Sequence, residues 1–447
     1  MMPMTTIEIA EALGAKISFD KEVVSVCTDT RKIEKGCVFV ALKGANFDGH
    51  SFVKQAIENG AVCAITEFQI GNAPCIVVEN TRKALLDLAK YYRSKFSPVL
   101  VGVTGSVGKT TSKEMIALAL SAKYKTLKNE GNLNNEIGVP ITLFGLDDSY
   151  GAAVIEMGMN HFGEINRLSS TAKPTVSVIT NIGYSHIENL GSQEGILKAK
   201  MEILNGMSID SPIILNADDE MLSTVALERK IITYGIENPS ADVRAVNIRG
   251  ELTSSFDILY DGKEYPVSLS CYGIHNVYNA AAAFAVGVSC GIEPEVIAEK
   301  LGEYETGGMR QNVKSINGQT VIVDCYNASP ASMKAALNVL SQMKPKKQGR
   351  RVAVLADMLE LGEMSKKLHE SVGEFVVKMN IDKLICYGKD AKYIASKADE
   401  LGLHSGCTSD KLMLIEYLRK TLQEDDIVLF KGSRGMKLEE IIEELYK

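Results

Sequence analysis

Several features that mark special classes of protein are absent from this sequence. Its 447 residues contain no uninterrupted apolar run of about 18 residues, the length that predicts a membrane-spanning helix. The nine cysteines include no C-x-x-C pair, which argues against a zinc site or a disulfide framework and favours reduced thiols. A net charge of −7 gives no basic excess for non-specific binding to nucleic acid. Residues 1–14 lack the basic and apolar regions of a signal peptide and predict an amphipathic helix.

What remains is the composition of an ordinary globular protein. Hydrophobic residues make up 45% of the chain and charged residues 23%, and no internal repeat or low-complexity segment is present. The length predicts about three domains. We therefore expect a cytoplasmic protein that does not insert into membranes and does not bind nucleic acid. We also expect a monomer, although composition does not bear on the oligomeric state.

Short apolar runs alternate with helix-length segments and divide the chain into three blocks. Residues 1–97 mix short strands with helices. Residues 98–308 predict a mainly parallel sheet wrapped by helices, with a β-rich patch at 242–269 and an alanine-rich helix after it. Residues 309–447 predict a smaller doubly wound domain, so the expected fold class is α/β. The runs expected to be strands are 37–42, 61–66, 75–79, 99–103, 152–155, 176–180, 213–215, 231–234, 320–324, 351–356, 383–388 and 426–432.

The segment VLVGVTGSVGKTT at 99–111 has the strand, glycine turn and helix start of a phosphate-binding loop. Its glycines allow the backbone N–H groups and the helix N-terminus to face an anion. In that context Lys109 supplies a charge for the β and γ phosphates of a nucleotide, and Thr110 supplies a hydroxyl for Mg²⁺. The pattern is incomplete, because Val103 stands where its first glycine would be, and a plain glycine-rich turn is the weaker interpretation. The candidate nucleotide-binding residues are Gly105, Ser106, Val107, Gly108, Lys109, Thr110 and Thr111.

Two further strand ends carry polar residues. Glu156 directly follows the run 152–155, and His186 ends the segment that follows 176–180. Alone, each would more often be a surface or loop residue. Ligands of open α/β sheets bind at the carboxyl ends of strands, so their shared position favours a metal–phosphate site. Thr110 and Glu156 offer oxygen ligands suited to Mg²⁺, whereas an imidazole indicates a second, more mixed site.

Two asparagine-rich segments have alternative interpretations. Asn132, Asn134 and Asn135 lie in a glycine-bounded segment, where turn chemistry or the binding of a polar, carbonyl-rich ligand would explain them. Asn276 and Asn279 share one face at a predicted helix start. Helix capping explains one of this pair but does not readily explain both.

At this point the chain resembles a known family. TGSVGKTT, GNLNNEIGVP, EMGMN, NIGYSHIENLGS, AKMEI, GIHNVYNAAAA, DCYNASPASM, VLADMLELGE and KGSRGMKLEE follow one another as in Mur ligases, from residue 29 to residue 435. The last four are similar to those of the member that joins D-Ala-D-Ala to UDP-MurNAc-tripeptide. This resemblance implies an N-terminal UDP-substrate-binding domain (1–97), a central ATP-binding domain (98–308) and a C-terminal Rossmann-like domain (309–447). It also implies a reaction that uses ATP and two Mg²⁺ ions and passes through an acyl-phosphate intermediate. The product would be the UDP-MurNAc-pentapeptide precursor of peptidoglycan.

The resemblance also assigns roles to individual residues. Thr110 and Glu156 match the first Mg²⁺ site, His186 matches the second, and Lys200 matches a lysine that the family carbamylates as a further metal ligand. From the residue pattern alone, Lys200 would be a solvated helix charge. The catalytic set is then Lys109, Glu156, His186, Lys200 and Asp324. Asn276 and Asn279 match adenine contacts, and Arg310, Asp324 and Tyr326 match residues that close over the nucleotide. Lys431 and Arg434 match a loop near the substrate. Asp29, Thr30 and Arg31 match the uridine-nucleotide pocket, and Asn132, Asn134 and Asn135 match the muramoyl-peptide loop.

Departures from the family pattern are small. Val323 replaces the first Asp of the family's D-D-x-Y-N form, Cys325 takes its variable position, and Ala356 replaces a usual glycine. No motif indicates the third residue of the tripeptide. Related alternatives are a MurE-like ligase, whose expected DNPR-type motif is missing, and a folylpolyglutamate synthase, against which the N-terminal Asp-Thr-Arg block weighs. A nucleotide-switch module that hydrolyses ATP to move a partner is the alternative from another class of protein.

Overall fold

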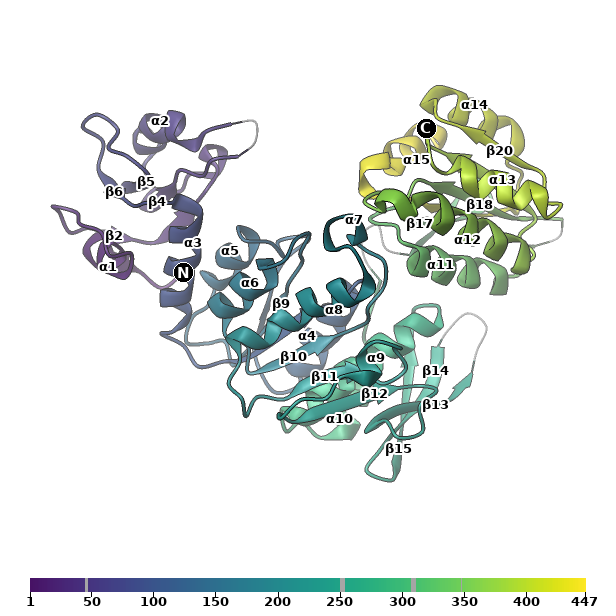
Figure 1. Ribbon diagram of the computed structural model, residues 1–447, viewed down its shortest axis with the longest axis horizontal. Coiled ribbons are helices and arrows are strands. Elements are labelled where there is room, and N and C mark those ends of the chain that lie inside the picture. The colour runs from purple at the N-terminus through teal and green to yellow at the C-terminus, as the bar shows by residue number, and fades with distance from the viewer. Residues whose placement is uncertain (45–46, 250–253, 307–310, 347) are drawn as a thin grey trace.

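The computed structural model describes residues 1–44, 47–249, 254–306, 311–346 and 348–447, which form three lobes in chain order (Figure 1). The α/β fold class is confirmed, because parallel strands form most of each main sheet and helices pack against them. None of the helices in these described ranges is both long and apolar enough to cross a bilayer.

The N-terminal lobe is built on a small parallel sheet. Its strand order is β3 (Ser25–Cys27), β4 (Cys37–Val40), β5 (Cys63–Thr66) and β6 (Cys75–Val77), and β1 (Met4–Thr5) pairs with β2 (Glu22–Val23) beside it. The helices are α1 (Thr6–Ala12), η1 (Thr30–Lys32), η2 (Gly49–Phe52), α2 (Val53–Glu58) and α3 (Thr81–Arg93). The predicted N-terminal helix is confirmed as α1, which begins with a capping box between Thr5 and Glu8.

The central lobe contains a nine-stranded sheet in the order β15-β14-β13-β12-β11-β10-β7-β9-β8. Its strands are β7 (Val99–Thr104), β8 (Thr126–Lys128), β9 (Ala152–Glu156), β10 (Val176–Ile179), β11 (Ile213–Asn216), β12 (Ile231–Gly235), β13 (Val243–Arg249), β14 (Ser254–Tyr260) and β15 (Lys263–Leu269). Its helices are α4 (Lys109–Ser121), α5 (Gly138–Leu143), α6 (Glu164–Ala172), α7 (Ile187–Leu190), α8 (Gln193–Met201), η3 (Glu202–Gly206), η4 (Leu222–Thr224), α9 (Ile274–Ser289) and α10 (Pro294–Gly302).

Both faces of the sheet are covered at β7, β9, β10 and β11, which explains why these strands are buried at nearly every position. Leu100 packs with α3, α5, α6 and α8 on one face, and Val101 packs with α4, α9 and α10 on the other. The chain leaves β7 toward β8 and β9 and then crosses to β10 on its other side. This reversal is a topological switch point, where an open α/β sheet binds its ligands.

The C-terminal lobe repeats this design on a smaller scale. Its sheet has the order β16-β17-β21-β18-β19-β20, in which only the pairing of β16 with β17 is antiparallel among the described residues. Its elements are β16 (Asn312–Ile316), β17 (Gln319–Asp324), α11 (Pro330–Gln342), β18 (Arg351–Ala356), η5 (Gly362–Met364), α12 (Ser365–Lys378), β19 (Lys383–Tyr387), α13 (Lys392–Glu400), β20 (Ser405–Thr408), α14 (Lys411–Thr421), β21 (Ile427–Lys431), η6 (Arg434–Met436) and α15 (Leu438–Leu445). The doubly wound expectation is confirmed, since α11 to α13 pack on one face and α14 and α15 on the other.

A buried arginine joins the N-terminal lobe to the central lobe. Arg93, at the end of α3, donates to the carbonyl of Ala172 at 2.9 Å and to that of Phe96 at 2.7 Å. Ala172 ends α6, so the guanidinium lies at the negative end of that helix. No carboxylate of the described residues pairs with Arg93, and burial lowers its pKa. Carbonyls alone therefore hold this cation at the junction.

Replacing this arginine should weaken the junction. Arg93→Met removes the donors and leaves buried carbonyls unpaired, which should cost roughly 2–4 kcal/mol of stability. Lys90→Met, at an exposed position of the same helix, should change stability by less than about 0.5 kcal/mol. Thermal unfolding of both variants measures the difference, and equal midpoints would contradict this account of the junction.

Candidate active site

The phosphate loop, residues 105–108, joins the end of β7 to the start of α4. Its two glycines have positive φ, +153° at Gly105 and +83° at Gly108. A Cβ at Gly105 would lie 1.8 Å from Thr180 Oγ1, and one at Gly108 would lie 2.8 Å from Asn279 Oδ1. The glycines of the motif therefore have a steric cause as well as a conformational one.

The neighbouring strand β10 is followed by an asparagine that holds this loop. Val107 N donates to Asn181 Oδ1 at 2.9 Å, and Ser106 N donates to the Asn181 carbonyl at 3.0 Å. Lys109 Nζ turns back over the loop and donates to the carbonyl of Gly105 at 2.9 Å. The loop is thus held in shape by the protein itself, with its lysine lying against it.

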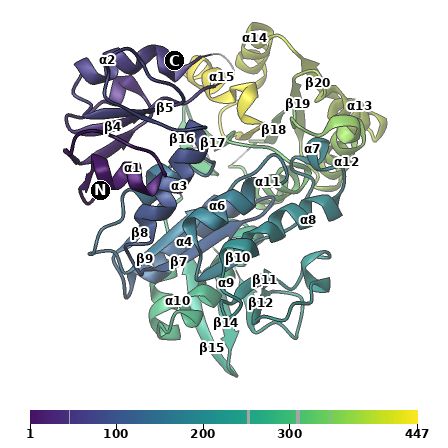
Figure 2. The same ribbon diagram turned by 60° about the vertical axis from the view of Figure 1, so that its left-hand side comes forward.

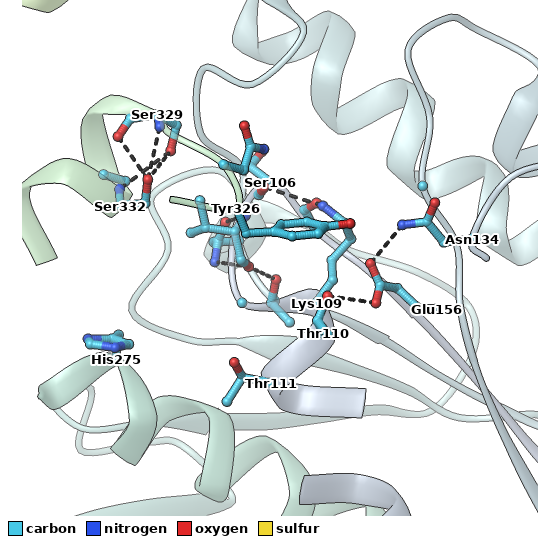
Figure 3. Close-up of a pocket in the computed structure, with 18 of the residues that line it drawn as sticks. Ser106, Lys109, Thr110, Thr111, Asn134, Glu156, His275, Tyr326, Ser329 and Ser332 are labelled. Atoms are coloured by element: carbon cyan, nitrogen blue, oxygen red, sulfur yellow. Dashed lines mark hydrogen bonds between the residues drawn. The ribbon is translucent and has the colours of Figure 1, made fainter. Parts of the chain in front are cut away.

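The carboxylate of Glu156 links three segments at the ends of the strands. Thr110 Oγ1 donates to Glu156 Oε2 at 2.8 Å, and Asn134 Nδ2 donates to Glu156 Oε1 at 2.8 Å (Figure 3). Buried Asn129 pairs with the backbone of Glu156 in both directions, at 2.9 and 3.0 Å. Glu156 is 2% exposed, so its position is closely determined.

The donors around this carboxylate suit Mg²⁺. A hydroxyl and a carboxylate oxygen lie beside the phosphate loop, and Mg²⁺ is usually held by one or two carboxylates together with substrate phosphates and water. No group of three or more His, Cys, Asp and Glu suited to holding a metal occurs among the described residues. The arrangement fits an ion that takes most of its ligands from a nucleotide.

Lys200, on α8, is buried and lines the same cavity as the phosphate loop. Burial, together with repulsion from Lys109, holds its pKa well below the usual value. No hydrogen bond or ion pair of the Lys200 ammonium is found within the described ranges. The interpretation of Lys200 as a solvated helix charge is therefore wrong. An amine that gives up its proton easily is the chemical requirement for carbamylation.

His186 follows β10 and lines the same cavity, but its contact comes from another lobe. Its Nδ1 lies 2.5 Å from Oε2 of Glu360, in the segment between β18 and η5. Contact with the imidazole lowers the pKa of the Glu360 carboxyl. The predicted second metal position is thus a meeting point of the central and C-terminal lobes.

The two asparagines at the start of α9 face the phosphate loop. Ser112 Oγ donates to Asn279 Oδ1 at 3.0 Å, and Asn279 Nδ2 donates to Asn276 Oδ1 at 3.2 Å. The N-cap of this helix is Gly273, and no side chain caps it. The expectation that capping explains one of the pair is therefore wrong, and both amides line the cavity.

The C-terminal lobe contributes polar residues from the ends of β17 and β21. Lys431 Nζ lies 2.7 Å from Asp324 Oδ2, and Lys431 is almost fully buried. Tyr326 projects into the pocket that also contains Lys109 (Figure 3). Arg434 pairs with Glu439 at 2.9 Å and also lines the cavity.

A single cavity of about 960 Å³ brings together most of the residues proposed from the sequence. It is lined by Gly105, Ser106, Val107, Gly108, Lys109, Thr110, Thr111, Asn132, Asn134, Asn135, Glu156, His186, Lys200, Asn276, Asn279, Asp324, Tyr326, Lys431 and Arg434. Arg310 lies outside the described residues.

The predicted uridine pocket lies apart from this cavity. Asp29, Thr30 and Arg31 belong to the N-terminal lobe around η1 and are not among the residues that line the cavity. Arg31 is exposed and pairs with Asp29 at 2.7 Å, and this contact lowers the pKa of Asp29 to about 2. Their assignment stays a prediction.

Several residues that support the site through hydrogen bonds or ion pairs were not predicted from the sequence. Asn181 follows a predicted strand, so an amide at a strand end was the available signal there. Asn129 follows β8, which was not predicted, and only its place before the asparagine-rich segment pointed to it. Asp219 accepts from Ile182 N at 2.8 Å and steadies the same β10 loop. Glu360 carried no local signal, because its partner is distant in sequence.

Comparison with known proteins agrees with this geometry. Three family models match: "Mur ligase family, catalytic domain" at 22–93, "Mur ligase middle domain" at 103–287, and "Mur ligase, glutamate ligase domain" at 309–434. UDP-N-acetylmuramoyl-tripeptide–D-alanyl-D-alanine ligase of Bacillus subtilis is 39% identical, with 100% of this chain and 99% of the relative covered. The enzyme of that name from Escherichia coli is 37% identical over 99% of this chain and 97% of the relative.

Solved structures lead to the same family. MurF from Acinetobacter baumannii superposes with a TM-score of 0.92 at 32% identity, covering 100% of this chain and 99% of the other. MurF from Thermotoga maritima, solved with ADP, gives 0.85 at 30% identity, covering 94% and 97%. Full-length identity above 30% and three matching domain models leave one conclusion. The chain belongs to the Mur ligase family.

Proposed function

We propose that this chain is the ATP-dependent ligase that joins D-Ala-D-Ala to UDP-MurNAc-tripeptide, forming the UDP-MurNAc-pentapeptide precursor of peptidoglycan. One observation carries the proposal at the level of chemistry. Lys109, the Thr110–Glu156 pair and buried Lys200 line one cavity with Asp324 of the C-terminal lobe. The residues proposed to bind phosphate and metal thus line one cavity with a residue proposed to close over the nucleotide.

The reaction must activate a carboxylate, which is a poor acyl donor. A carboxylate oxygen of the tripeptide attacks the γ-phosphorus of ATP, and the bond to the ADP oxygen breaks. The dipeptide amine then attacks the acyl carbon, and the tetrahedral intermediate collapses with loss of phosphate. Lys109 and the loop N–H groups offset the charge of the phosphates while the two anions approach.

The metal ligands fall into two proposed groups. Thr110 and Glu156 would hold one Mg²⁺, and His186 with carbamylated Lys200 would hold a second. Mg²⁺ supplies charge neutralisation at the phosphoryl group when bound. Carbamylation would turn the buried amine of Lys200 into a carboxylate-like ligand, and its low pKa supports that step. Asn276 and Asn279 are proposed to contact adenine, with Arg310 and Tyr326 closing over the nucleotide.

Residues outside the phosphate site are proposed to bind the outer parts of the substrate. Asp29, Thr30 and Arg31 would bind the uridine nucleotide, and Asn132, Asn134 and Asn135 the muramoyl peptide, with Lys431 and Arg434 near the reacting end. Domain boundaries near residues 97 and 308 belong to the same proposal, as do a monomeric state and a cytoplasmic location.

Phosphate release with single substrates omitted tests this function. Release should require ATP, UDP-MurNAc-tripeptide and D-Ala-D-Ala together, and mass spectrometry should detect the pentapeptide product. Turnover of ATP without the amine or the UDP substrate would favour a nucleotide switch. Ligation of glutamate to a folate would favour the folylpolyglutamate synthase alternative.

Lys109 should be required for turnover. Lys109→Ala removes the charge beside the phosphates, and ligation should fall by on the order of 10³-fold. The thermal midpoint should stay near that of the wild type. Lys123→Ala, at an exposed position just beyond α4, is the matched control and should keep its activity. Near-normal ligation by a folded Lys109→Ala protein would contradict the assignment of the phosphate loop.

An added small carboxylate should partly replace the function of the Lys200 side chain. Lys200→Ala should be nearly inactive and partly rescued by acetate or formate, because a small carboxylate can occupy the vacated position. Lys200→Arg should not be rescued, since the guanidinium keeps its charge and fills the space. Lys198→Ala, at an exposed position of the same helix, should be fully active without added carboxylate. A fully active Lys200→Ala protein would refute carbamylation.

Ligands should compact the molecule. The proposed uridine residues lie outside the cavity that contains Lys109, so one substrate that reaches both must draw the domains together. Small-angle scattering should show a smaller radius of gyration with a non-hydrolysable ATP analogue plus UDP-MurNAc-tripeptide. An unchanged radius at saturating ligand would contradict closure.

A further inference from the structure

The contact between His186 and Glu360 bridges two lobes. His186 immediately precedes α7 of the central lobe, which lies beside the C-terminal lobe (Figures 1 and 2). Glu360 lies just before η5 of the C-terminal lobe, and α7 contacts η5. A Cβ at Gly362 would lie 3.3 Å from Glu188 Cβ, so the backbones also approach closely. The pair is part of an interface and is not an isolated surface contact.

Glu360 has a defined place on the C-terminal lobe. The two residues before it are anchored through their backbone amides, because Met358 N donates to His369 Nε2 at 3.0 Å and Leu359 N donates to Ser433 Oγ at 3.0 Å. Both acceptors belong to the C-terminal lobe. Glu360 therefore moves with that lobe, and its distance from His186 reports where the lobe lies.

The backbone at both partners is unusual. His186 and Glu360 each have φ of 63°, a left-handed conformation that is uncommon for residues other than glycine. Strained residues of this kind persist where the surrounding structure determines them, and they cluster at functional sites. The two side chains are thus brought together by their local backbones from opposite sides of the interface.

The ring nitrogen of His186 that contacts Glu360 determines which of its nitrogens remains to bind a cation. A histidine that ligates a metal usually has its other ring nitrogen turned to a carboxylate, which fixes the tautomer and the ring orientation. Here Nδ1 of His186 lies 2.5 Å from Oε2 of Glu360, the distance of an ion pair. No hydrogen bond to this nitrogen is found in the described ranges, so the Glu360 carboxylate is the polar group that it faces. Nε2 is then the nitrogen left for a cation.

We propose that Glu360 is a positioning residue for the second cation site. It orients His186 through Nδ1 so that Nε2 serves as the ligand, and it does so from the C-terminal lobe. Cation binding and the position of that lobe are therefore coupled. This inference rests on the proposed function, which places a cation at His186. The opposite role, in which Glu360 masks the histidine, predicts an effect of the opposite sign.

Mn²⁺ binding to the full chain distinguishes these roles. Electron paramagnetic resonance counts bound Mn²⁺, with and without ADP, in the wild type, Glu360→Gln and Glu363→Gln. Glu363 is exposed in the same segment and offers the matched change of charge. The Mn²⁺ ion bound at the His186 site should have a 10- to 100-fold lower affinity in Glu360→Gln. Its affinity in Glu363→Gln should equal that of the wild type. Tighter binding to Glu360→Gln would show masking, and equal binding would show no role, and either result overturns the proposal.

The histidine ring gives a readout independent of activity. The chain has six histidines, so ¹⁵N-histidine labelling gives few NMR signals. The signal that is missing from the spectrum of His186→Gln belongs to His186. His186 should carry its proton on Nδ1 in the wild type and lose that preference in Glu360→Gln. An unchanged tautomer would contradict the proposal.

Dependence on Mg²⁺ separates this inference from the proposed function. Raised Mg²⁺ should restore ligation by Glu360→Gln, as expected for a weakened site, while Glu363→Gln needs no rescue. A wild type that fails to ligate D-Ala-D-Ala would refute the proposed function, even with the Mn²⁺ result intact. A wild type that ligates normally, beside a Glu360→Gln protein with unaltered Mn²⁺ binding, would refute the inference alone.

Discussion

The buried carboxylate of Glu156 is the group on which the rest of the site depends. It accepts one hydrogen bond from the first turn of α4 and another from the loop that contains Asn134, and Asn129 fixes its backbone. Leaving such a charge unpaired would be costly, so the phosphate loop and the asparagine loop are held in one relation to β9. A cation bound beside Thr110, as proposed, would satisfy the same requirement.

Two lysines near this carboxylate have different environments and therefore different chemistry. Lys109 keeps its ammonium against loop carbonyls at the start of a helix, where it can exchange them for phosphate oxygens. Lys200 is buried close enough to Lys109 to be repelled by it, and its pKa is lowered. Burial thus lowers the pKa of Lys200, whereas Lys109 lies against the loop carbonyls at the edge of the cavity.

Local patterns in the sequence predicted the parts of this molecule that depend on local chemistry. The apolar strands, the phosphate loop and the strand-end position of Glu156 follow from runs of residues and their spacing. The edge strands β8, β16 and β20 were missed, because short strands at the edge of a sheet carry weak apolar patterns. The burial of Lys200 and the partner of His186 were also missed, since each depends on segments far apart in the chain. Asn129 follows one of these weak strands, so its only visible signal was its place before the asparagine-rich segment, which ordinary turn chemistry explains equally well.

The central claim is that the chain activates a carboxylate by phosphorylation inside a cavity shared between the central and C-terminal lobes. Transfer of ¹⁸O tests it most directly, with UDP-MurNAc-tripeptide labelled at its terminal carboxylate. The acyl phosphate keeps the labelled oxygen on phosphorus when its acyl bond breaks. The account predicts one ¹⁸O atom in each phosphate released, with ligation of D-Ala-D-Ala. Unlabelled phosphate released in step with the ligated product would contradict it.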